Sequence, residues 1–87
     1  MKISDKDRVA LIRKGNQLFN EGKIDLAAKI FEAVNYKDGL IRIGDYYYER
    51  NQPLIALKYY TKARYKPRID EIMEKVVVAL NQWLKEK

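Results

Sequence analysis

Residues 37–65, KDGLIRIGDYYYERNQPLIALKYYTKARY, decide the fold, because the same pattern of residues also occurs 29 positions earlier in the chain. In each copy, large residues at helical spacing lie beside a glycine, and an alanine is followed four positions later by an aromatic residue. Each copy therefore predicts two amphipathic helices, and the chain predicts an array of helical hairpins. The matched positions are Leu11, Gly15, Leu18, Phe19, Ala27, Phe31 and Val34 in the first copy, and Leu40, Gly44, Tyr47, Tyr48, Ala56, Tyr60 and Ala63 in the second.

A fifth helix is predicted over residues 68–86, where an apolar stripe begins with Ile69, Ile72 and Val76. This stripe starts in register with a third copy of the pattern but continues without a second turn. We expect the helix to cover the apolar end of the array, as the terminal units of helical repeats do. Pro67 is expected to end the fourth helix, and Asp38 is expected to cap the third.

Composition indicates one small domain, over residues 1–87, that carries a net charge of +6. The chain contains no Cys and no His, so neither a disulfide nor an imidazole ligand is available. We expect no catalytic residue, no metal site and no cofactor, because the sequence has no phosphate-binding glycine loop and no pairing of a nucleophile with a base. No apolar stretch is long enough for a membrane span, so the expected location is cytoplasmic.

The spacing resembles that of the tetratricopeptide repeat. The second copy matches the family pattern at Leu40, Ile43, Gly44, Tyr47, Ala56, Tyr60 and Ala63. The first copy departs from it at Lys14 and Val34, and both copies are shorter than the family repeat, which has about 34 residues. The resemblance implies an all-α, right-handed array of helical hairpins, an α-solenoid with five helices. Its parts would be repeat one at 8–36, repeat two at 37–65 and a capping helix at 68–86.

The repeated small and aromatic residues have a predicted structural role. Gly15 and Gly44 are expected where paired helices approach closely, and Phe31 and Tyr60 should fill the gaps between adjacent pairs. The run Tyr46-Tyr47-Tyr48 is divided by helical spacing. We expect its second residue to be buried, its third to line a groove and its first to be partly exposed.

In the tetratricopeptide repeat family, ligands bind in the concave groove formed by the first helix of each pair. The resemblance implies a groove here lined by Arg13, Asn16, Phe19, Ile41, Arg42, Asp45, Tyr48 and Glu49. Aromatic and arginine side chains often anchor protein interfaces. The expected function is therefore that of a non-catalytic adaptor or scaffold that binds a peptide or helix of a partner protein. An ordinary solvated face is the alternative interpretation of the same charged residues.

The segment from Lys58 to Arg68 carries five basic side chains and no acidic one. Lysines four positions apart on a helix form one exposed stripe, which is consistent with a plain solvated face. The alternative function is a nucleic-acid-binding accessory protein that uses this face through charge and tyrosine stacking. Its expected contacts are Lys58, Lys62, Arg64 and Lys66. A homo-oligomer formed through exposed array ends, near Trp83 and Leu84, is a third possibility.

Overall fold

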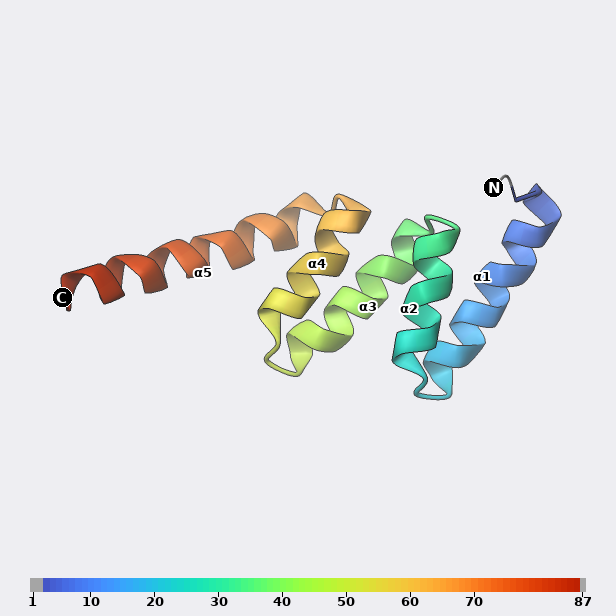
Figure 1. Cartoon of the computed structure of the whole chain (residues 1–87), viewed down its shortest axis with the longest axis horizontal. Coiled ribbons are helices and arrows are strands. Elements are labelled where there is room, and N and C mark those ends of the chain that lie inside the picture. The colour runs from blue at the N-terminus through green and yellow to red at the C-terminus, as the bar shows by residue number, and fades with distance from the viewer. Residues whose placement is uncertain (1–2, 87) are drawn as a thin grey trace.

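The computed structural model describes residues 3–86, which form five α-helices and no β-strand. The first four helices pack as two neighbouring pairs, and the fifth projects away from them along the long axis of the molecule (Figure 1). This axis measures 55 Å, against 25 and 19 Å for the other two. The predicted all-α fold with five helices is confirmed. The helices are α1 (Asp5–Asn20), α2 (Ile24–Ala33), α3 (Lys37–Glu49), α4 (Pro53–Ala63) and α5 (Lys66–Lys85).

Local sequence accounts for several helix ends. Ser4 caps α1, where its Oγ accepts a hydrogen bond from the backbone N–H of Asp7 at 3.2 Å. Pro53 lies in the first turn of α4, where its missing N–H and fixed φ suit the helix. Asp38 does not cap α3: the cap position is Tyr36, and Asp38 lies in the first turn, where an acidic side chain suits the positive end of the helix dipole.

The backbone repeats with the period of the sequence. Positive φ angles occur at Gly22 (83°) and at Asn51 (59°), its equivalent in the second copy, and likewise at Asn35 (51°) and its equivalent Arg64 (54°). The turn hydrogen bonds recur in the same way: Lys23 N donates to Leu18 O and Gln52 N to Tyr47 O, both at 2.9 Å. The starts of α2 and α4, and those of α3 and α5, are separated by the same period. The repeat is therefore a repeat of chain geometry as well as of side chains.

Aromatic rings from the second helix of each pair fill the core against glycines. A β-carbon on Gly15 would lie 2.5 Å from the ring of Phe31, and one on Gly39 would lie 2.6 Å from the same ring. A β-carbon on Gly44 would lie 2.6 Å from the ring of Tyr60. Both rings are fully buried, so the small residues make room for an aromatic ring at the junction of successive helices.

The fifth helix begins two residues earlier than predicted. Pro67 lies in the first turn of α5 instead of ending α4. The fourth helix ends at Ala63, because Arg64 adopts a left-handed conformation. Tyr65 takes the cap position of α5 as Tyr36 does for α3, so the third copy of the pattern begins in register.

The first half of α5 packs against the rest of the chain. Ile72 is buried, and Ile69 and Val76 pack against the core around Ala56 and Tyr60. Beyond Val76, the large apolar side chains are about half exposed, so this part of the helix does not cover the end of the stack as expected. They are Val77 (51%), Val78 (54%), Leu80 (53%), Trp83 (54%) and Leu84 (57%). Within residues 3–86, none of the helices combines the length and apolar character that a membrane crossing requires.

Candidate functional site

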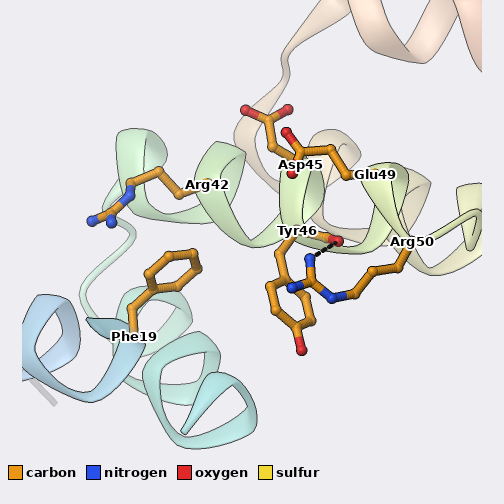
Figure 2. A pocket seen from close by; sticks show the side chains of 6 residues that line it. All are labelled: Phe19, Arg42, Asp45, Tyr46, Glu49 and Arg50. Atoms are coloured by element: carbon orange, nitrogen blue, oxygen red, sulfur yellow. Dashed lines mark hydrogen bonds between the residues drawn. The ribbon is translucent and has the colours of Figure 1, made fainter. Parts of the chain in front are cut away.

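An open hollow of about 360 Å³ lies between the C-terminal end of α1 and the exposed face of α3 (Figure 2). Its lining comes from both helix pairs, so the packing of α1 and α2 against α3 sets its width. Four of the lining residues belong to the groove predicted from sequence, and two do not. The lining residues are Phe19, Arg42, Asp45, Tyr46, Glu49 and Arg50.

One arginine of the hollow joins the two helix pairs. The guanidinium carbon of Arg42 lies 4.3 Å from the centre of the Phe19 ring. Its Nη1 donates a hydrogen bond to Oδ1 of Asn16 on α1 at 2.9 Å. A cation over an aromatic face together with a hydrogen bond favours this orientation of the guanidinium. Arg42, Asn16 and Phe19 were all predicted as groove residues, and the structure brings them together.

A second arginine of the hollow, Arg50, lies over a second aromatic ring, that of Tyr46. The guanidinium carbon of Arg50 is 3.5 Å from the centre of the Tyr46 ring, and Nη1 donates to the Tyr46 carbonyl oxygen at 3.0 Å. The Tyr46 ring in turn meets the edge of the Phe19 ring, with centroids 6.3 Å apart. Tyr46 and Arg50 were not among the site residues expected from the sequence. Their spacing of four on the end of a helix was the available signal.

Two carboxylates lie along the same helix. Asp45 and Glu49 project from one side of α3, on the edge of the hollow away from the Tyr46 ring (Figure 2). Asp45 accepts a hydrogen bond of 2.5 Å from the hydroxyl of buried Tyr60. Burial first, and then this hydrogen bond, raise the pKa of Tyr60 above its usual range. Asp45 is thereby anchored to the core, whereas Glu49 is exposed.

Tyr48 belongs to a different cluster, on the side of α3 that meets α5. Its ring lies 4.6 Å from the guanidinium carbon of Arg68 and 5.1 Å from Nζ of Lys75. Lys75 donates to the Tyr48 hydroxyl at 2.7 Å, and Arg68 donates to Glu71 at 2.7 Å. The structure therefore separates Tyr48 from the hollow, and its two cationic neighbours were not foreseen because they come from the next helix.

The other predicted groove residues and the middle tyrosine lie elsewhere. Arg13 is exposed on α1, and Ile41 is half-buried between the two parts of the core. Tyr47 is half-buried instead of buried, since its hydroxyl reaches Asp25 at the surface, 3.1 Å away. Its ring stacks on Tyr59 with centroids 5.9 Å apart, so it contributes to packing between α3 and α4.

Acidic side chains neighbour the basic segment in space. Lys62 pairs with Glu32 of α2 at 3.7 Å, and Lys66 pairs with Asp70 at 3.0 Å. Lys58 lies 5.3 Å from the centre of the Tyr59 ring, and Arg64 is exposed at the end of α4. The positive charge of this face is therefore partly neutralised. Over residues 3–86, no cluster of acidic side chains is arranged to hold a metal ion.

No family model matches this chain. The chain is 41% identical, over 78 residues, to an uncharacterized protein of Treponema pallidum (strain Nichols). The aligned region covers 90% of this chain and 75% of the Treponema protein. No solved structure matches the chain.

Proposed function

The chain belongs to one family with the Treponema pallidum protein, and we propose that it is a non-catalytic adaptor that holds a segment of a partner protein. The binding surface is the hollow between α1 and α3. The array belongs, in this proposal, to the right-handed helical repeats of the tetratricopeptide type and acts in the cytoplasm. The common period of the turns and the helix starts supports the array.

The observation that carries the proposal is the pair of arginine-covered rings in the hollow. Phe19 lies under Arg42, and Tyr46 lies under Arg50. Arginine and aromatic side chains dominate the energetics of protein interfaces. Because a hydrogen bond and a ring contact already favour these orientations of both guanidinium groups, less side-chain entropy is lost when a partner binds. The carboxylates of Asp45 and Glu49 add acceptors for a donor on the bound segment.

The experiment is a quantitative pull-down from the lysate of the source organism, with nuclease-treated and untreated samples. The bait is compared with an Arg42→Glu variant and with an Arg64→Glu variant, which makes the same change on an exposed residue outside the hollow. We expect a discrete protein that survives nuclease, is retained by Arg64→Glu and is lost with Arg42→Glu. Equal recovery of the partner protein on both variants would contradict binding at the hollow.

Nucleic-acid binding through the basic segment is the second candidate, favoured by the net charge of +6. The pairing of Lys62 and Lys66 with acids reduces the charge available to phosphates. This function would appear in the same experiment as recovered nucleic acid, with proteins lost on nuclease treatment and with Arg64→Glu. Its affinity would also fall steeply with salt.

A further inference from the structure

An uncharged apolar stripe runs along the projecting half of α5. No charged side chain occurs from Val76 to Leu84. Met73, which precedes this half, and three residues within it lie on one face of the helix at successive spacings of four, three and four. They are Met73 (44% exposed), Val77 (51%), Leu80 (53%) and Leu84 (57%). We call this set the α5 stripe.

A second helix of the repeat type does not fit this stripe. In α1 and α3, Gly15 and Gly44 leave room for an aromatic ring of the following helix. The residue of α5 that occupies the equivalent position, one period after Gly44, is Met73. A ring placed as Tyr60 is placed would overlap this side chain. The helix that covers the stripe must therefore meet it with interlocking aliphatic side chains, as in a coiled coil.

We propose that α5 pairs with α5 of a second copy of this chain in an antiparallel arrangement. The spacing of four, three and four is the same in both directions along the helix. A twofold axis between the helices therefore brings Met73 of each copy against Leu84 of the other, and Val77 against Leu80. Such a surface is complementary to itself, as a twofold interface must be.

The residues beside the stripe favour the antiparallel direction. Glu74, Asn81 and Lys85 lie along one edge of the stripe, and Val76 and Trp83 lie along the other. In an antiparallel pair, each edge meets its own equivalent, so Lys85 of one copy lies near Glu74 of the other and Trp83 lies near Val76. In a parallel pair, the polar edge would face the apolar edge and place Glu74 against apolar side chains.

The shape of the molecule leaves space for this pairing. The second half of α5 projects away from α3 and α4 (Figure 1). In an antiparallel pair, the two sets of α1–α4 lie at opposite ends of the paired helices. The interface uses one half-helix from each copy, which is small for a permanent dimer. We therefore expect a reversible dimer that forms in the micromolar range or above.

The first test measures mass against concentration by sedimentation equilibrium. Its expected result is a shift from the monomer mass of 10.3 kDa to that of a dimer, together with a change in the emission of Trp83, the only tryptophan. Leu80→Glu should weaken dimerisation by at least about tenfold, because it places a charge in the centre of the stripe. The control is Leu54→Glu, at a leucine of α4 that is 68% exposed. Far-UV circular dichroism checks that both variants are folded.

The second test determines direction. Since the chain has no Cys, Met73→Cys and Leu84→Cys proteins can be mixed and oxidised. An antiparallel pair brings these positions together, whereas a parallel pair leaves them about 16 Å apart along the helix. We expect the mixture to form a disulfide-linked heterodimer faster than either protein alone forms a homodimer. A chain that stays monomeric, a dimer equally weakened by Leu54→Glu, or faster linkage within one variant would overturn the proposal.

Discussion

At Gly44 the absence of a β-carbon gives the Tyr60 ring its place in the core. The recurrence of Gly15 and Gly44 at the same position of the pattern predicted a close approach of paired helices at both glycines. It did not predict that Gly39 would contact the Phe31 ring, since no glycine occupies the equivalent position of the other copies. A contact that occurs in one repeat alone leaves no periodic signal.

We predict that Gly44→Ala destabilises the fold by about 1–3 kcal/mol, because the new methyl group overlaps the Tyr60 ring. Urea denaturation followed by circular dichroism measures the change. In a Tyr60→Leu background, the same substitution should cost less, since the smaller side chain leaves room for the methyl group. Equal costs in both backgrounds would contradict the proposed overlap.

A second prediction concerns the ionisation of two tyrosines. Burial raises the pKa of Tyr47 to about 12, from an ordinary value of 10.0, and also raises the pKa of Tyr60. The folded state thus favours the neutral phenols. The stabilisation that the folded state gains from these neutral phenols is complete below about pH 10. It is lost as the pH rises from 10 through about 12. The free energy of unfolding should fall over this range, and Tyr60→Phe should reduce the fall. An unchanged pH dependence in that variant would argue against a role for Tyr60.

Among the helices, α5 shows where prediction from sequence reaches its limit. The helix pairs were predicted because two copies of one pattern support each other. The start of α5 was misplaced because a proline is compatible both with the end of one helix and with the first turn of the next. The left-handed Arg64 separates α4 from α5, and nothing in an arginine indicates this conformation.

Arg64→Gly should stabilise the chain by roughly 1 kcal/mol, because glycine adopts a left-handed conformation without strain from a β-carbon. Thermal denaturation measures the gain. Arg64→Ala is the matched control: it removes the same charge but keeps the β-carbon, so it should give no such gain. A similar rise in melting temperature for both variants would instead show that the lost charge causes the stabilisation.

The whole molecule is longer than a globular chain of its size. Its radius of gyration is 15.7 Å, whereas a compact domain of this length has about 12 Å. Sequence predicted a repeat array but not the projecting half of α5, because apolar residues at helical spacing are expected to be buried. The hollow was predicted in part. Arg42 and Phe19 followed from the groove positions, whereas Arg50 reaches Tyr46 by lying back along its own helix.

Removal of residues 77–87 should leave the melting of α1–α4 nearly unchanged, because core residues of α5 such as Ile72 precede the cut. The same truncation should abolish the concentration-dependent increase in mass. Circular dichroism and sedimentation of the truncated protein measure the two properties separately. A large loss of thermal stability at low concentration would indicate that the projecting half supports the monomer.

The matching turns before α3 and α5 have a consequence for engineering. The same dipeptide, Tyr-Lys, opens both helices, as Tyr36-Lys37 and Tyr65-Lys66. In both turns, the tyrosine N–H donates to the carbonyl oxygen of the aromatic residue five positions before it, at 2.9 Å. An extra copy of residues 37–65 inserted between Tyr65 and Lys66 would therefore meet a native junction at each end. The length of the molecule can therefore be changed in steps of one whole repeat. Each inserted repeat would move α5 further from α1.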